Sequence, residues 1–150
     1  MREEQGDIWE AYNAGLWIVI PTNGDWRKDG ACVMGRGLAL QTKERFPCFP
    51  YDLGERLREY GNVVFTFQRY RIITFPVKHH WNEMADLHLI EESAKALQEI
   101  FKYNLSGIPT PIYLPRVGCG NGKLDWKNVK PILEATLDNR FIIISLENQE

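Results

Sequence analysis

Two glycine-rich segments of the chain contain residue types that can hold a phosphate. The segment LPRVGCGNGKLDW, residues 114–126, places three glycines within five positions, and VMGRGLALQ, residues 33–41, contains two more. Glycine lacks a Cβ atom and adopts backbone dihedrals that other residues avoid, so several N–H groups can approach one anion. A helix that starts directly after such a loop adds a favourable dipole. Two loops of this kind suit a diphosphate better than a lone phosphate, whereas one loop alone can equally be a structural turn.

A lysine and its two neighbours are candidates for covalent or acid–base chemistry. Lys78 lies in the segment FPVKHHW, and an amine in a desolvated or cationic setting loses its proton readily and becomes a nucleophile. A solvated lysine at the end of a strand is the alternative. His79 and His80 can act as an acid or base or contact a phosphate. Adjacent side chains of an extended segment point in opposite directions, so at most one of the two histidines faces a site.

The cysteines offer one further nucleophile and no metal site. Cys119 lies inside the second glycine segment, where a helix dipole can favour a thiolate. A small side chain that packs inward is the alternative. The three cysteines, Cys32, Cys48 and Cys119, have the spacing of neither a disulfide framework nor a zinc site. We therefore expect no metal and no cofactor.

Composition and motif content exclude several classes of function. Neither glycine segment has the Lys-Ser/Thr pair of a P-loop or the GxGxxG of a dinucleotide-binding fold, which disfavours a conventional nucleotidase or dehydrogenase. The formal net charge of -2 argues against a broad nucleic-acid-binding surface, although basic residues between positions 27 and 45 leave a local one open. No apolar stretch approaches the roughly 18 residues of a membrane helix, and the N-terminus lacks the pattern of a signal peptide. A cytoplasmic protein without membrane contacts is expected.

The hydrophobic pattern predicts a single domain, residues 1–150, in which strands and helices alternate. Short apolar runs predict buried strands, and apolar residues at three- and four-residue steps predict helices. The strands are expected at residues 16–20, 63–67, 71–75, 111–114 and 141–145, and the helices at residues 37–46, 51–60, 87–101 and 129–137. This alternation is typical of a largely parallel sheet with helices on both faces. Both glycine segments can then lie at the carboxyl ends of strands, where ligands of open α/β folds bind.

These motifs, in this order, resemble those of a macrodomain, an ADP-ribose-binding module. The resemblance rests on Gly-Asp-Ile at 6–8, on Asn23 after the first core strand, and on the segments VMGRGLALQTKERFP, FPVKHHW and LPRVGCGNGKLDW. It covers nearly the whole chain and is strongest to the branch with the terminal ADP-ribose glycohydrolase and the antitoxin macrodomains that remove ADP-ribose from DNA. The resemblance implies a three-layer α/β/α fold with a mixed, mostly parallel sheet of about six strands.

The same resemblance implies a role for each matching residue. Asp7 would hydrogen-bond the adenine amino group, with Ile8 beside the ring, and Asn23 would lie near the distal ribose. Lys78 would be the catalytic residue that attacks the anomeric carbon of this ribose, because the opened sugar presents an aldehyde to the amine. The other expected ligand-binding residues belong to the two glycine segments: Val33, Met34, Gly35, Arg36, Gly37, Leu38, Val117, Gly118, Cys119, Gly120, Asn121 and Gly122.

Three features depart from the family pattern. Protein-directed glycohydrolases of this branch have an acid in the second glycine loop, and its place is taken here by Gly122, as in the DNA-directed relatives. Asp125 is three residues away and is better suited to cap a helix. The first strand is nearly absent, because only MREEQ precedes Gly6, and the segment DWRKDG lengthens the loop after Asn23.

The expected activity is hydrolysis of ADP-ribosyl linkages on a protein or a nucleic acid, with release of ADP-ribose, by a monomer. Two alternatives share the same pocket. One is a phosphatase or deacylase that acts on a small ADP-ribose derivative, and the other is a reader that binds ADP-ribose without turning it over. Trp81 and Trp126 are each either core residues or covers of the site.

Overall fold

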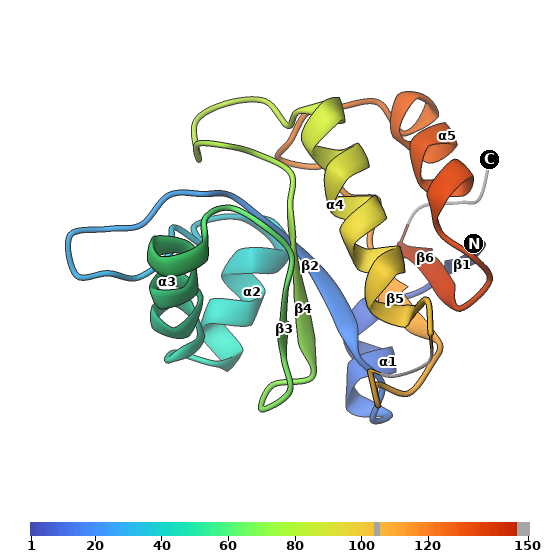
Figure 1. The fold of residues 1–150 in the computed structure, drawn as a ribbon, viewed down its shortest axis with the longest axis horizontal. Coiled ribbons are helices and arrows are strands. Elements are labelled where there is room, and N and C mark those ends of the chain that lie inside the picture. The colour runs from blue at the N-terminus through green and yellow to red at the C-terminus, as the bar shows by residue number, and fades with distance from the viewer. Residues whose placement is uncertain (104–105, 147–150) are drawn as a thin grey trace.

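The computed structural model describes residues 1–103 and 106–146, which form one six-stranded sheet between two layers of helices (Figure 1). The strands lie in the spatial order β1-β6-β5-β2-β4-β3, and neighbours are parallel except for β3 and β4. The strands are β1 (Arg2–Gln5), β2 (Ile18–Thr22), β3 (Phe65–Phe67), β4 (Ile72–Pro76), β5 (Ile112–Leu114) and β6 (Phe141–Ser145). The helices are α1 (Ile8–Asn13), α2 (Gly37–Arg45), α3 (Phe49–Tyr60), α4 (Leu87–Phe101) and α5 (Trp126–Thr136). The predicted three-layer fold with a mixed, mostly parallel sheet is confirmed.

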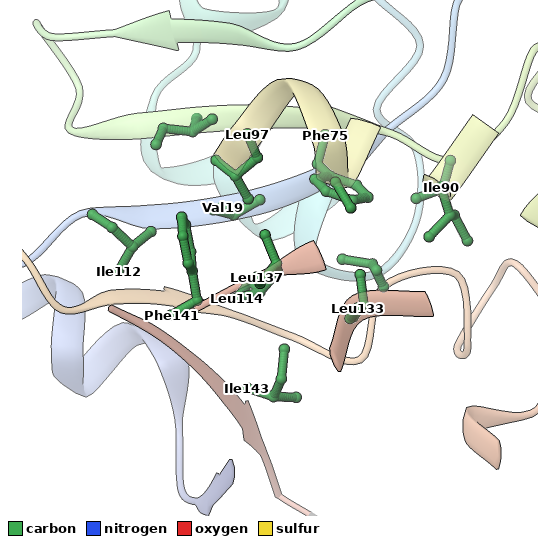
Figure 2. Packing of buried hydrophobic residues seen from close by; sticks show 14 of the residues in the cluster. Val19, Phe75, Ile90, Leu97, Ile112, Leu114, Leu133, Leu137, Phe141 and Ile143 are labelled. Carbon is green, nitrogen blue, oxygen red and sulfur yellow. The ribbon is translucent and has the colours of Figure 1, made fainter. Parts of the chain in front are cut away.

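The two faces of the sheet carry separate hydrophobic cores because side chains alternate along each strand. Val19 of β2 belongs to the cluster formed with α4 and α5, and its neighbours Ile18 and Ile20 belong to the cluster formed with α1, α2 and α3. Figure 2 shows the first cluster, in which Leu97 of α4 and Phe141 of β6 are fully buried. A central strand buried on both faces explains the unbroken apolar run at residues 16–20.

The first strand is present, although the sequence has no apolar run there. Residues of β1 pair in parallel with β6, from Arg2 opposite Ile142 to Gln5 opposite Ser145. An edge strand is held by backbone hydrogen bonds along one side and can therefore consist of charged and polar residues. Glu3 adds side-chain contacts to α5, where it accepts from Trp126 Nε1 at 3.2 Å and pairs with Lys130 at 2.7 Å.

Small differences in element boundaries have local causes. The second predicted helix begins two residues earlier than expected, at Phe49, because Pro50 lies in its first turn, where proline needs no hydrogen-bond donor. The predicted strand at 63–67 is shortened to β3, which pairs only from Phe65 to Phe67. No helix in the described part of the chain combines the length and the apolar composition required to cross a lipid bilayer.

The order of the strands creates a crevice at the carboxyl end of β2. From β2 the chain passes through α2 and α3 on one face before it reaches β4, and from β4 it passes through α4 on the other face to β5. Because β4 and β5 flank β2 on opposite sides, the connections diverge above the end of this strand. In open α/β sheets this reversal of strand order is where ligands bind.

Candidate active site

A cavity of about 530 Å³ lies at the carboxyl ends of β2, β4 and β5, within the size range of small-molecule sites. It contains the ends of three strands together with both glycine segments. Its lining consists of Pro21, Thr22, Asn23, Val33, Met34, Gly35, Arg36, Gly37, Leu38, Ala39, Val77, Lys78, Trp81, Pro115, Arg116, Gly118, Gly120, Asn121 and Gly122. The fold thus brings residues from 21 to 122 in the sequence around one space.

Most of the predicted site residues line this cavity, and four do not. The lining includes Lys78, Asn23, all of residues 33–38, and four of the six residues at 117–122. Asp7 is exposed and caps α1, where its Oδ1 accepts from Trp9 N at 2.9 Å, and Ile8 is buried behind it. These placements leave the adenine-binding role of Asp7 and Ile8 a prediction.

The other two predicted residues outside the lining, Val117 and Cys119, face the protein. Val117 is fully buried in the cluster under α4 and α5. The Cys119 thiol donates to the carbonyl oxygen of Val117 at 3.6 Å, and its side chain packs against the same cluster. This placement matches an inward-packing cysteine and not a nucleophile in the cavity.

The glycines of the two segments serve different purposes. At Gly118 a Cβ atom would lie 2.7 Å from Ile90 Cδ1, and at Gly122 it would lie 2.4 Å from the carbonyl oxygen of Gly118. These two glycines are therefore required by packing within the loop and against α4. At Gly35 and Gly120 a Cβ atom would meet nothing within 4 Å, and neither residue has a positive φ. Both line the cavity, so their missing side chains leave space in the cavity itself.

Lys78 joins the end of β4 to the second glycine segment. It is half-buried, and its Nζ donates to the carbonyl oxygens of Asn121 at 3.1 Å and Trp81 at 3.4 Å. Desolvation, together with the positive charges of Arg36 and Lys123, lowers the pKa of Lys78 from its ordinary value. These two carbonyl oxygens accept two of the three N–H groups of the ammonium. In the neutral amine, which has two N–H groups, the remaining position holds the lone pair.

The charged side chains that line the cavity, among the described residues, are all positive. In the described chain, the ionisable side chains of its lining are Arg36, Lys78 and Arg116, which are three cations and no carboxylate. The nine-residue helix α2 also begins at the lining residue Gly37, so its N-terminal dipole end lies at the cavity. Clustered positive charge in a partly desolvated space favours an anionic ligand. Within the described residues, no group of three or more His, Cys, Asp or Glu side chains is placed to hold a metal ion.

Asn23 connects segments around the cavity through side-chain hydrogen bonds. Its Nδ2 donates to the carbonyl oxygen of Val33 at 3.0 Å, and its Oδ1 accepts from Asp25 N at 3.0 Å. The Asp25 carboxylate continues this network, because it accepts from Trp81 N at 2.7 Å and binds His80 Nδ1 at 2.9 Å. The network fixes the loop after β2 against the turn that follows Lys78.

His79 and His80 do not line the cavity, and each pairs with a carboxylate. His79 pairs with Asp86 at 2.9 Å and His80 pairs with Asp25. Partial burial raises the pKa of Asp25, but the hydrogen bonds from His80 and from Trp81 N outweigh this effect, so the pKa lies below its ordinary value. The same hydrogen bond to Asp25 raises the pKa of His80. Both histidines therefore stabilise the turn after Lys78 through their carboxylate partners.

The structure explains why the second glycine segment has a glycine, and not an acid, at position 122. Gly122 is buried, and a side chain there would collide with the backbone of Gly118, so this loop conformation has no room for a carboxylate. Asp125 caps α5, where its Oδ1 accepts from Lys127 N at 3.1 Å, as the sequence predicts. It does not line the cavity.

Sequence reasoning missed lining residues that have no distinctive chemistry. Thr22, Val77 and Pro115 line the cavity because each lies at or just beyond the carboxyl end of a strand. Arg116 is the important omission, since it supplies one of the three cations, and its guanidinium also lies 5.4 Å from the ring centroid of Trp126. The position of Arg116 two residues after β5 was the available signal.

Comparisons with known proteins agree with this geometry. No family model matches the chain. It is 32% identical to the "DNA ADP-ribosyl glycohydrolase" of Thermus aquaticus over 92% of its own length, but spans only 38% of that curated relative. Among solved structures, the macrodomain of Mycobacterium tuberculosis DarG matches with a TM-score of 0.77 and 26% identity, covering 98% of this chain and 97% of that one. The macrodomain of Thermus aquaticus DarG matches with a TM-score of 0.68 and 28% identity, with 96% of each chain covered.

These likenesses extend over nearly the whole chain. The sequence motifs and the solved structures point to the same fold. The chain has the macrodomain fold and is similar throughout to the macrodomains of DarG proteins.

Proposed function

We propose that this macrodomain binds ADP-ribose in the cavity and hydrolyses ADP-ribosyl linkages on a macromolecule, with release of ADP-ribose. The observation that carries the proposal is the lining itself, which combines three cations, no carboxylate and two glycines whose missing side chains leave space. A diphosphate fits this combination, because it needs positive charge and close approach to backbone N–H groups. In this proposal the segments at 33–38 and 118–122 enclose the diphosphate from two sides.

Lys78 supplies the reacting group. Its Nζ lone pair forms a bond to the anomeric carbon of the distal ribose, and the bond from this carbon to the macromolecule breaks. The leaving group takes the bonding electrons and the proton that the nitrogen releases. Opening of the sugar ring gives a Schiff base, and addition of water then returns the lysine amine and free ADP-ribose. The lowered pKa of Lys78 supports this role, because only the neutral amine has a lone pair.

The absence of a carboxylate from the lining bears on the leaving group. Since the described lining has no acidic side chain to protonate the departing atom while its bond breaks, the step suits a group that can leave as an anion and take up the proton from the nitrogen afterwards. A base nitrogen of low basicity or a carboxylate meets this condition, and an alkyl amine does not. The name of the Thermus aquaticus relative favours DNA as the carrier of the adduct. The cytoplasmic location and the monomeric state expected from the sequence stay predictions.

A reader without turnover is the second candidate. The observation that favours it is Gly122, where the acid of protein-directed glycohydrolases cannot be accommodated. In a reader, Lys78 would hold the second glycine segment through Asn121 and contact phosphate as a cation. A phosphatase or deacylase of small ADP-ribose derivatives shares the pocket, and only its substrates distinguish it.

Calorimetric titration with ADP-ribose and cleavage assays on ADP-ribosyl-DNA and ADP-ribosyl-protein test the proposal together. Micromolar binding and release of free ADP-ribose from one adduct are expected. Binding without release from any adduct would establish the reader, and turnover of phosphorylated or acylated ADP-ribose alone would establish the small-molecule enzyme. A wild-type protein that binds no ADP-ribose would overturn all three assignments.

A further inference from the structure

The loop after Asn23 is an ordered hairpin, which we call the 25–33 hairpin. Val33 N donates to the carbonyl oxygen of Asp25 at 3.0 Å, Arg27 N donates to that of Ala31 at 2.7 Å, and Trp26 pairs with Cys32 in an antiparallel bridge. Figure 1 shows this segment, in blue after β2, extending outward past α3. The long insertion is therefore a defined projection at the mouth of the cavity.

Contacts with α3 hold the hairpin in place. Cys32 N donates to the carbonyl oxygen of Pro50 at 2.8 Å, Arg58 Nη1 donates to that of Gly30 at 2.5 Å, and the Tyr51 hydroxyl donates to Asp29 Oδ2 at 3.1 Å. A hairpin anchored at its base and its tip presents its side chains in fixed positions, which lowers the entropy cost of binding a partner.

The two strongly exposed tryptophans lie on connected stretches of backbone, since Trp81 lines the cavity and Trp26 belongs to the hairpin. Of the five tryptophans in the chain, only Trp26 and Trp81 are strongly exposed, at 48% and 53%. The Asp25 carboxylate joins their backbones, because Trp26 follows it directly and Trp81 N donates to it at 2.7 Å. By contrast, Trp9 and Trp17 are buried, and Trp126 is half-buried with its Nε1 bonded to Glu3. Exposed indoles on hydrogen-bonded backbones provide flat apolar surfaces for a partner.

Cations accompany these indoles. Arg27 and Lys28 follow Trp26 on the hairpin, and both side chains are exposed. Arg27 pairs with Asp29 at 3.0 Å, so Lys28 is the hairpin cation that we assign to a phosphate. Arg36 and Lys123 are exposed on the glycine segments, close enough to Lys78 for their charges to act on it. Aromatic side chains for bases together with cations for the phosphate backbone are the combination with which proteins bind single-stranded nucleic acid.

The position of Lys78 connects this surface to the reaction. Its Nζ donates to the carbonyl oxygen of Trp81 at 3.4 Å, so the proposed nucleophile is held directly beside this residue. From these contacts we infer that the 25–33 hairpin and Trp81 form a binding surface for single-stranded nucleic acid, on which bases of the substrate stack next to the cavity. The inference rests on the proposed function, since it locates where the macromolecule that carries the ADP-ribose binds. A single strand is required because stacking on an indole needs an unpaired, accessible base face.

Trp26→Ala tests the surface, because Trp26 lies outside the cavity lining. For a single-stranded oligonucleotide that carries ADP-ribose on a base, KM is expected to rise about tenfold, as loss of one stacking contact predicts. For a single nucleoside carrying the same adduct, KM and the Kd of ADP-ribose are expected to stay unchanged. Tyr103→Ala is the matched control, since this tyrosine is 67% exposed beyond the far end of α4, and it should change neither substrate.

Salt dependence gives an independent measurement. Lys28→Glu is expected to weaken oligonucleotide binding and to reduce its salt slope by about one unit, because a phosphate contact is lost. An equal effect of Trp26→Ala on both adducts, or no effect on either, would overturn the surface. A larger effect on an ADP-ribosyl-peptide than on the oligonucleotide would assign it to protein substrates instead.

Failure of the proposed function gives a different result. A wild-type protein that releases ADP-ribose from no adduct would refute the hydrolase, and the surface would then be tested with the unmodified oligonucleotide alone. Quenching of tryptophan fluorescence that Trp26→Ala abolishes would support the surface even then. No binding of this oligonucleotide by the wild type at low salt would overturn it.

Discussion

The ammonium of Lys78 donates to the backbone carbonyl oxygen of Asn121, 3.1 Å away, and so links the end of β4 to the second glycine segment. The Asn121 side chain approaches the first glycine segment as well, because a Cβ atom on Gly37 would lie 2.7 Å from its Nδ2. Asn121 therefore lies between the candidate nucleophile and the start of α2. A ligand that occupies the cavity contacts a lysine whose position is already set by the opposite loop.

Replacement of Lys78 separates chemistry from binding. We expect Lys78→Ala to lower kcat on the preferred adduct by at least about a thousandfold, since the attacking amine is lost. The Kd of ADP-ribose should rise by roughly ten- to a hundredfold at most, the value of one charged hydrogen bond. Single-turnover kinetics and calorimetry measure the two quantities. Lys95→Ala on the exposed face of α4 is the control, and unchanged turnover of Lys78→Ala would refute the lysine mechanism.

The two kinds of glycine should respond differently to substitution. Gly120→Glu places a side chain in open cavity space, so the Tm should change little while ADP-ribose binding is lost. Gly118→Ala adds a Cβ at a φ of 78° and 2.7 Å from Ile90, which costs about 1–2 kcal/mol for the backbone and about 1–3 kcal/mol for overpacking. The Tm of Gly118→Ala should therefore fall by roughly 5 °C or more.

Thermal unfolding and calorimetry on the same preparations distinguish these effects. Gly35→Glu serves as the second cavity variant, because Gly35 also has nothing near its missing Cβ. A large fall in the Tm of Gly120→Glu would mean that this glycine is structural. Undiminished binding by both glutamate variants would mean that the ligand lies elsewhere.

The pH dependence of turnover should report the lowered pKa of Lys78. Because desolvation and nearby cations favour the neutral amine, kcat is expected to rise with pH and to level off with a midpoint below that of an ordinary lysine. Lys123→Gln removes one of these charges without altering the cavity lining, so the midpoint should move upward. Lys127→Gln is an exposed control beyond Asp125. A midpoint that Lys123→Gln leaves in place would show that its charge does not reach the amine.

The pair of His80 and Asp25 should titrate as a unit that holds the turn before Trp81. The pKa of His80 is raised, so its contribution to stability is complete below about pH 6.5 and is lost as the pH rises through the raised pKa. The pKa of Asp25 is lowered, so its contribution is present above about pH 4 and is lost as the pH falls through the lowered pKa. The turn is therefore stabilised most between about pH 4 and about pH 6.5.

Nuclear magnetic resonance of the His80 imidazole measures this coupling directly. Asp25→Asn should return the pKa of His80 toward its ordinary value, because the hydrogen bond and the negative charge are removed together. Asp29→Asn changes a carboxylate that pairs with Arg27 and should leave the titration of His80 in place. A His80 pKa that is insensitive to Asp25→Asn would contradict the observed pairing.

The sequence by itself determined the layered fold and most of the cavity lining. Strands such as β2 and β6 are buried on both faces or nearly so, and such strands must be continuous apolar runs. Helix α4 repeats apolar residues at helical spacing because one of its sides faces the core. The glycine segments and Lys78 were identifiable because their residue types are costly or reactive, and because each follows a predicted strand.

Only the tertiary structure decided what each of these residues does. The sequence cannot separate Gly118 and Gly122, which Ile90 and the loop backbone constrain, from Gly35 and Gly120, which face open space. Strand β1 was missed because backbone pairing with β6, rather than an apolar pattern, holds it. The link between Asp25 and Trp81 joins residues far apart in the chain. Such contacts depend on how distant segments meet, and periodicity and composition report only on neighbours along the sequence.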